Sequence, residues 1–386
     1  MGDFKFIDLF SGIGGFHQAM TSLGGECILA SEIDKAAIET YSENYNIDSN
    51  INIRDIDAKN IKDFDVLCAG FPCQTFSKAG KQEGFNDETK GTLFFEIERI
   101  LKTKHPKYII LENVKNLISH DKGNTFKIIK KHLKDCGYRL TEKPLILSPH
   151  QFGIPQLRDR VIILGMYDPS RTDVPLNISF NNLNNKMNVN FYSIIEENAD
   201  PKYNISEYEE MVLNAWDKFY KGIDLKVIGF PIWAEYFKKA ASDNMPSWKK
   251  DFINKNNELY KRNQKFIDEW LKEYNNLNDF VPTHRKFEWQ CGTSINTLWD
   301  GLIQMRPSGI RVKIPVCFPA LVAIVQVPII GKYKRRLTVR EAARLQSFPE
   351  NFIPNKNDQQ AYKQFGNAVN VEVIKRCAEK LFDYLD

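Results

Sequence analysis

The chain has 386 residues, of which 42% are apolar and 26% are charged, and its formal net charge at pH 7 is +4. This composition argues against a disordered chain, and no apolar run approaches the ~20 residues that a membrane-spanning helix needs. The seven cysteines are scattered without paired spacing, which argues against a disulfide framework and a zinc site. We therefore expect a cytoplasmic protein with one large and one smaller domain.

The first 166 residues alternate short apolar runs with amphipathic stretches. The runs FKFIDLF, ECILAS, DVLCAG, KYIILEN and RVIILGM predict buried strands, and apolar residues at helical spacing lie between them, at 93–101 and 126–133. This alternation predicts an α/β fold with a doubly wound, Rossmann-like sheet. The ligand site of such a sheet is expected at the carboxyl ends of its strands.

The pattern changes after residue 169. Residues 171–200 are rich in asparagine, and the stretch 248–274 has aromatic residues at the spacing of a helix that buries one face. Strands and helices no longer alternate, so we expect a second, smaller domain here. Between Gly301 and Arg340 there are eight Lys and Arg residues and no Asp or Glu. This basic tract is either a phosphate-binding surface or a solvated basic face.

The first predicted strand leads directly into DLFSGIGGF. Gly12 and Gly14 let a ligand approach the backbone, and the helix that follows offers unpaired N–H groups to an anion. Glu32 ends the second strand 20 residues after Gly12, about where nucleotide-binding sheets carry an acid that binds a ribose. Asp55, in RDID, is compatible with a contact to an adenine amino group. The alternatives are a surface carboxylate for Glu32 and a turn cap for Asp55.

Cys73 lies in GFPCQTFS, just past the predicted strand DVLCA. Pro72 has a fixed φ and no N–H donor, which suits the end of a strand, so the thiol is expected at the ligand-binding edge of the sheet. The alternative is a cysteine that only packs. The segment 77–92 follows, with glycines and lysines typical of a mobile lid that meets phosphates.

Two more blocks point to the same edge. The strand KYIILEN delivers Glu112 and Asn113, and a carboxylate beside a thiol suggests an acid paired with a nucleophile. In QLRDR, the strand period of two puts Gln156, Arg158 and Arg160 on one face, where arginines suit anions or a carbonyl oxygen. The alternatives are a structural carboxylate and a charged, exposed strand.

Taken together, the blocks resemble those of the DNA (cytosine-5)-methyltransferases of prokaryotic restriction-modification type. The resemblance covers about the first 166 residues and the last 50. It rests on six blocks in the order of that family: DLFSGIGG, GFPCQTFS, ENV, QLRDR, RRLTVREAARLQSFP and QFGNAVN.

The resemblance implies transfer of a methyl group from S-adenosyl-L-methionine to C5 of a cytosine that is flipped out of double-stranded DNA. Cys73 would attack C6 while Glu112 hydrogen-bonds N3, and Arg158 and Arg160 would steady the base and its phosphate. No metal is expected. The residues that would hold the methyl donor are Phe10, Gly12, Gly14, Glu32, Asp55, Ile56, Leu93, Asn367 and Val369.

The resemblance also implies the organisation of the chain. A catalytic domain is expected at 1–170, a target-recognition domain at 171–335, a hinge at 336–365 and a C-terminal helix at 366–386 that returns to the catalytic domain. Thr297-Leu298 is one candidate for the target-reading pair of the family. Ala320-Leu321 lies where the pair is rather expected, but with alanine in place of threonine. The expected partner is double-stranded DNA, with a restriction endonuclease acting separately, and the protein is expected to be a DNA-associated monomer.

Three rival interpretations remain at this point. A related enzyme class methylates cytosine in transfer RNA, but it has a different run after the cysteine and lacks so long a target-reading segment. A binding module without activity has no need for the thiol at Cys73. Adenine and N4-cytosine methyltransferases use an Asp/Asn-Pro-Pro-aromatic block, which this sequence lacks.

Overall fold

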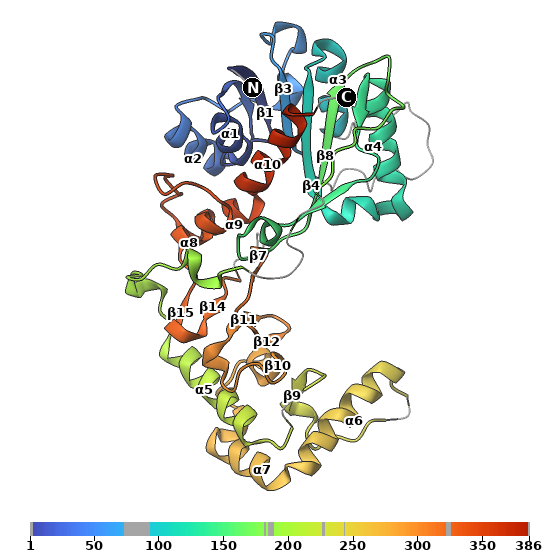
Figure 1. Cartoon of the computed structure of the whole chain (residues 1–386). Coiled ribbons are helices and arrows are strands. Elements are labelled where there is room, and N and C mark those ends of the chain that lie inside the picture. Colours follow the sequence, from blue (N-terminus) through green and yellow to red (C-terminus); the bar gives the residue numbers. More distant parts are fainter. Residues whose placement is uncertain are drawn as a thin grey trace. The chain divides into compact units, whose positions relative to one another are not determined.

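The computed structural model describes residues 3–72, 93–180, 183, 189–225, 228–242, 244–321 and 326–384. The chain divides into two compact units, each of which can be followed in Figure 1. The first unit comprises Met1–Ile194, Pro319–Ala323 and Val339–Asp386, and the second comprises Ile195–Phe318 and Ile324–Thr338. No helix in the described ranges is long and apolar enough to cross a membrane.

The first unit is built on a sheet whose strands follow the order β2-β1-β3-β4-β8-β5, with β6 paired to β8. The five apolar runs form five of these strands, which confirms the predicted α/β sheet. The strands are β1 (Phe4–Leu9), β2 (Gly25–Ser31), β3 (Val66–Gly70), β4 (Tyr108–Val114), β5 (Tyr138–Leu140), β6 (Leu145–Leu147) and β8 (Arg160–Tyr167).

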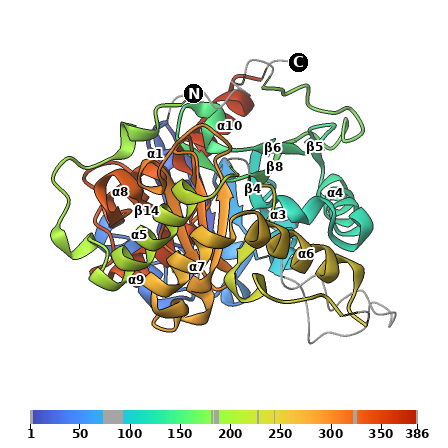
Figure 2. The ribbon, with the colours of Figure 1, turned by 90° about the horizontal axis from the view of Figure 1, so that it is seen from below.

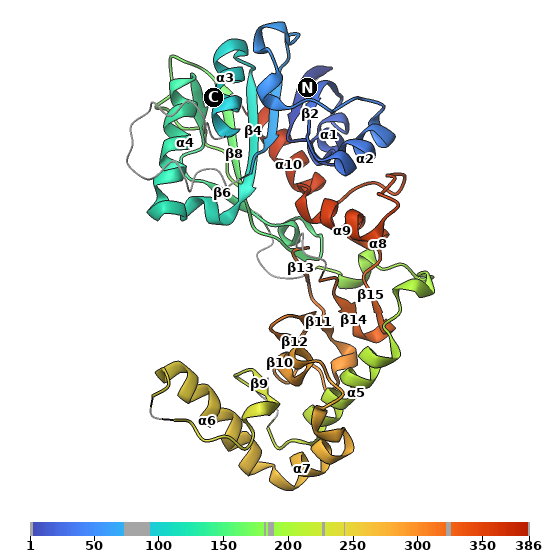
Figure 3. The ribbon, with the colours of Figure 1, turned by 180° about the vertical axis from the view of Figure 1, so that it is seen from behind.

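Helices cover both faces of this sheet (Figures 1 and 3). Side chains of α3 and α4 pack into one core with alternate residues of the strands, and α1 and α10 pack together on the opposite face. The predicted helical stretches are confirmed. The helices of the first unit are α1 (Gly15–Thr21), α2 (Lys35–Tyr45), α3 (Leu93–Lys104), α4 (Asn124–Asp135), α8 (Val339–Leu345), α9 (Asp358–Asn367) and α10 (Val371–Phe382).

The direction of the strands determines which residues meet at the edge of the sheet where the ligand site is expected. β1, β2, β3 and β4 are parallel, and Gly70 at the end of β3 pairs with Glu112 in β4. β8 runs antiparallel to β4, so that its first residue, Arg160, pairs with Val114 at the carboxyl end of β4. The beginning of β8 therefore lies at the same edge as the ends of the parallel strands.

The second unit pairs a mixed sheet, in the order β15-β14-β11-β12-β10-β9, with helices that can be followed in Figure 2. Its core contains Trp216, Trp270 and Phe287, and the rings of Trp216 and Phe287 stack 4.9 Å apart. The elements are α5 (Glu207–Gly222), β9 (Ile232–Trp233), α6 (Ser247–Arg262), α7 (Gln264–Glu273), β10 (Lys286–Gln290), β11 (Leu302–Arg306), β12 (Gly309–Lys313), β14 (Ile329–Ile330) and β15 (Arg335–Arg336).

Two expectations about continuous elements were wrong. The stretch 248–274 is two helices, because α6 ends at Arg262 and α7 begins at Gln264. The block QLRDR is not one strand, because β7 (Gln156–Leu157) ends before Arg158 and β8 starts at Arg160. The interruption means that the two arginines do not share one strand face and can have different partners. One further short strand, β13 (Phe318–Pro319), lies where the chain passes between the units.

Candidate active site

A cavity of about 310 Å³ opens at the carboxyl edge of the parallel strands in the first unit. Its lining comes from the segments that follow β1, β2 and β3, from β4, and from α9 and the turn after it. Glu112 and Pro72 line this same cavity. The predicted donor residues in its lining are Phe10, Gly12, Glu32, Leu93, Asn367 and Val369.

The three other predicted donor residues, Gly14, Asp55 and Ile56, do not line the cavity. Gly14 stands between Ile13 and Gly15, which both line the cavity. Asp55 ends a short 3₁₀ turn that starts at Ile53, another lining residue. Ile56 is buried in the core of the sheet, and its carbonyl accepts a hydrogen bond from Arg99.

Glu32 is fixed by three backbone N–H groups. Its Oε2 accepts a hydrogen bond from Gly12 at 2.8 Å, and its Oε1 accepts from Ile33 at 2.7 Å and from Asp34 at 2.9 Å. A carboxylate oxygen can accept two hydrogen bonds, so Oε1 is already saturated and Oε2 keeps capacity for one hydroxyl group of a ligand. The carboxylate therefore joins the glycine loop after β1 to the end of β2 and still faces the cavity.

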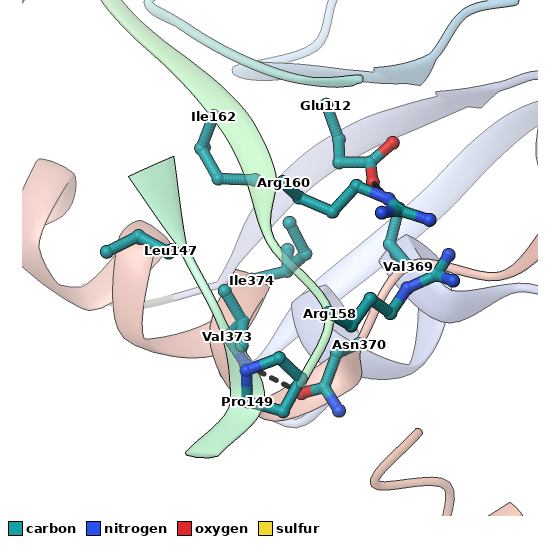
Figure 4. Close-up of a pocket in the computed structure, with 10 residues that line it drawn as sticks. All are labelled: Glu112, Leu147, Pro149, Arg158, Arg160, Ile162, Val369, Asn370, Val373 and Ile374. Atoms are coloured by element: carbon teal, nitrogen blue, oxygen red, sulfur yellow. Dashed lines mark hydrogen bonds and ion pairs between the residues drawn. The ribbon is translucent and has the colours of Figure 1, made fainter. Parts of the chain in front are cut away.

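Glu112 is a buried carboxyl with one basic partner. Nε of Arg160 lies 2.9 Å from Oε1 of Glu112, and Figure 4 shows the two side chains meeting. Burial raises the pKa of Glu112, and the charges of Arg160 and Arg158 oppose this increase. A carboxyl held in this way takes up a proton more readily than an exposed one and can then donate a hydrogen bond.

Arg158 has a different set of partners. Its side chain is buried and donates through Nη1 to the carbonyl of Gly366 at 2.9 Å and through Nη2 to the carbonyl of Ala368 at 2.8 Å. Burial, together with the charge of Arg160, lowers its pKa to about 9. Figure 4 shows it beside Val369 and Asn370. The guanidinium thus fastens the turn that carries Asn367 and Val369 into the cavity.

Cys73 and the proposed lid at 77–92 lie outside the described residues, which resume at 93. The chain that leads to Cys73 is nevertheless well anchored. Gly70 pairs with Glu112, Phe71 is buried, and the side-chain amide of Asn113 donates to the carbonyl of Phe71 at 2.7 Å. Asn113 was predicted at this edge together with Glu112, but its contact with the carbonyl of Phe71 was not.

The sequence analysis also missed lining residues with no motif of their own. Ile33 lines the cavity, and 70% of its surface is exposed. Lys363 lines it from α9, and its Nζ lies 3.2 Å from Oδ2 of Asp34. Their only sequence signal is position: Ile33 follows Glu32, and Lys363 precedes the QFGNAVN block.

The fold is similar to that of a protein whose structure has been solved. The solved structure of Entamoeba histolytica methyltransferase EhMeth matches with a TM-score of 0.55 and 19% identity, over 100% of this chain and 99% of that chain. At the level of sequence, the family model described as C-5 cytosine-specific DNA methylase matches residues 4–383.

Two curated relatives support the same assignment. Type II methyltransferase M1.ScrFI of Lactococcus lactis subsp. cremoris is 36% identical, over 99% of this chain and 79% of its own length. Type II methyltransferase M.HhaI of Haemophilus parahaemolyticus is 32% identical, over 97% of this chain and 93% of its own length. The chain belongs to the family of C-5 cytosine-specific DNA methylases, and its activity is the methylation of cytosine in DNA at C5.

The different partners of the two arginines predict different defects. Arg158→Ala removes both donors from the carbonyls of Gly366 and Ala368, so the dissociation constant for S-adenosylhomocysteine should rise by about tenfold, the equivalent of roughly 1.4 kcal/mol. Arg160→Ala removes the partner of Glu112 and should reduce turnover while this constant changes by less than about twofold. Calorimetric titration and single-turnover methylation distinguish the two. Equal loss of affinity in both variants would contradict the assignment.

Proposed function

We propose that this protein flips a cytosine out of a specific double-stranded DNA sequence and methylates it through a covalent bond between Cys73 and C6. The observation that carries the proposal is the shared cavity, because six of the nine residues proposed to hold the methyl donor line the same space as Glu112. Pro72 lines it too, and Cys73 is the next residue in the chain. A base placed there would meet the acid and the methyl donor together.

Glu112 is the proposed acid of the reaction. In its protonated form it would donate a hydrogen bond to N3 of the cytosine, which makes C6 more susceptible to a thiolate. The burial that raises its pKa favours this form, and Arg160 holds the carboxyl in place at 2.9 Å. Arg160 also keeps N–H groups with which to reach a carbonyl or phosphate oxygen of the nucleotide.

Cys73 is the proposed nucleophile. Its thiolate would form a bond to C6, and the electron pair of the C5–C6 double bond would then attack the methyl group that S-adenosyl-L-methionine supplies, releasing S-adenosylhomocysteine. Removal of the C5 proton by a base would restore the double bond and expel the thiolate. Because a cytosine stacked in a duplex cannot reach the cavity, the base must first leave the helix, at a cost of a few kcal/mol.

The second unit is the proposed reader of the DNA sequence. Register places Glu288, Gln304 and Arg311 side by side across β10, β11 and β12, while the alternate residues of these strands are buried in the aromatic core. A sheet with one apolar face and one face of amide and guanidinium groups suits contacts to base edges and phosphates. The hydroxyl of Thr297 donates to Oδ1 of Asp217 at 2.7 Å, so its hydrogen is already engaged within the unit.

The basic tract carries less uncompensated charge than its sequence indicates. Glu288 forms ion pairs with Arg306 and Arg311, at 2.7 Å and 2.9 Å. Lys334 pairs with Glu210, and Arg336 pairs with Glu209. Lys313, at the end of β12, has a pKa lowered by burial and then by the charge of Arg311. A nearby phosphate would relieve this repulsion, so Lys313 is our candidate for a phosphate contact.

The biological role proposed here is protection of DNA from a restriction endonuclease. It rests on the curated relatives, which are named Type II methyltransferases. The rival interpretation of a transfer RNA methyltransferase has less support, because the matching family is described as acting on DNA. We propose that the protein acts as a DNA-associated monomer, separately from any endonuclease.

A mechanism-based trap tests the nucleophile. If every cytosine of a duplex is replaced by 5-fluorocytosine, the substituent at C5 cannot leave as a proton, so the bond between Cys73 and C6 should persist. A complex stable to denaturing electrophoresis is expected with S-adenosyl-L-methionine and not without it. Cys73→Ser should abolish it, and Cys68→Ala, five residues earlier in β3, should retain it. An adduct that survives loss of Cys73 would refute the mechanism.

The role of Lys313 has a separate test. If Lys313 neutralises one phosphate, Lys313→Ala should reduce the slope of log affinity against log salt by about 0.9. The matched control is Lys218→Ala, which removes an exposed lysine of the same unit that pairs with Glu273. Affinity for a duplex fragment is measured from 50 to 200 mM salt with S-adenosylhomocysteine present. An unchanged slope in Lys313→Ala, or the same change in the control, would remove Lys313 from the DNA surface.

A further inference from the structure

The glycine loop of the donor cavity is held by a tyrosine from a distant part of the first unit. Tyr45 is the last residue of α2, and its hydroxyl donates to the carbonyl of Gly14 at 3.1 Å and to that of Ile13 at 3.3 Å. Ile13 and Gly15 line the cavity. Tyr45 therefore contacts the backbone of the loop whose residues would touch the donor.

The ring of Tyr45 is fixed by its neighbours. The His17 ring stacks on it with centroids 3.9 Å apart and 19° between the planes, and Tyr41 meets it edge-on at 4.7 Å. Nδ1 of His17 also lies 2.7 Å from the hydroxyl of Tyr41. Burial lowers the pKa of His17 to about 4, so this stack is uncharged at neutral pH. The hydroxyl of Tyr45 is consequently positioned before any ligand binds.

The loop and the tyrosine fit each other closely. Gly14 has a φ of +86°, which L side chains rarely adopt, and a Cβ at this position would lie 2.2 Å from a ring carbon of Tyr45. The absence of a side chain at Gly14 thus lets the ring reach the carbonyls. The need for glycine here comes from Tyr45 as well as from the backbone conformation.

The loop is held from two sides. Glu32 accepts the N–H of Gly12 at 2.8 Å, and Tyr45 donates to the carbonyls of the next two residues. Both contacts originate at α2, since Glu32 lies just before it and Tyr45 ends it. Because glycine can adopt many backbone conformations, contacts of this kind restrict a loop that contains Gly12 and Gly14 to one of them.

We propose that Tyr45 is a positioning residue for the methyl donor: its hydroxyl orders the loop 12–14 in advance, so that less conformational freedom is lost when the donor binds. The inference rests on the proposed donor site. It assigns to Tyr45 no contact with the donor or with the cytosine, so the effect of removing its hydroxyl should appear in donor affinity and not in the chemical step.

Tyr45→Phe tests this role, because it keeps the ring stack and removes only the hydroxyl. The dissociation constants for S-adenosyl-L-methionine and S-adenosylhomocysteine should rise about fivefold, together with KM for the donor. The kcat at saturating donor and the affinity for duplex DNA should change by less than about twofold. Calorimetry and steady-state methylation provide these values.

The matched control is Tyr138→Phe. Tyr138 is a fully buried tyrosine of the same unit whose hydroxyl also donates to a backbone carbonyl, that of Pro106, at 2.8 Å. This variant should lower the melting temperature and leave donor affinity unchanged. Wild-type affinity in Tyr45→Phe, or an equal loss in both variants, would overturn the inference. A wild-type protein that binds no donor would overturn the proposed donor site, and the inference with it.

Discussion

A carboxyl group that is taken out of water needs a partner, and Glu112 has Arg160, with 2.9 Å between Oε1 and Nε. The pair depends on the direction of β8. Because β8 runs antiparallel to β4, the first residue of β8 reaches the end of β4, where Glu112 lies. A parallel β8 would place Arg160 at the opposite edge of the sheet and leave the buried carboxyl without this charge, at a cost of several kcal/mol.

The same short segment connects the proposed site for the base with the proposed site for the donor. Arg158, two residues before Arg160, donates to the carbonyls of Gly366 and Ala368 and thereby fixes the turn that carries Asn367 and Val369. Residues from the beginning and the end of the chain consequently line one cavity. Arg158 and Arg160 have separate partners, so a single block of sequence contributes to both proposed sites.

Much of the fold was predictable because its signals are local. Five apolar runs became five strands, and apolar residues at helical spacing became α3 and α4. The direction of β8 was not predictable, since an apolar run looks the same in a parallel and an antiparallel strand. The break between Leu157 and Arg160 was also missed. Because of this break, Arg158 does not lie in β8 and donates to backbone carbonyls instead. These hydrogen bonds join residues more than 200 positions apart, which no sequence periodicity reveals.

In the candidate site too, residues with a local sequence signal were predicted and residues that depend on tertiary contacts were not. Glu32 and Glu112 were found because each ends a predicted strand, whereas Ile33, Lys363 and Tyr45 act through tertiary neighbours that sequence spacing does not reveal. The uncompensated positive charge of the basic tract was overestimated, because ion pairs with acids elsewhere in the chain are not visible in the sequence. The acids that pair with its arginines and lysines, such as Glu288, come from other elements of the second unit.

The central claim is that Glu112 is a buried carboxyl, poised to hold a proton and restrained by Arg160. A ¹³C NMR titration of protein labelled at the glutamate carboxyl carbons tests it, with the resonance of Glu112 assigned by its loss in Glu112→Gln. We expect a pKa above the ordinary value of 4.5, and a further increase in Arg160→Ala, because the opposing charge is then gone. A pKa at or below 4.5, or one that falls in Arg160→Ala, would contradict this account.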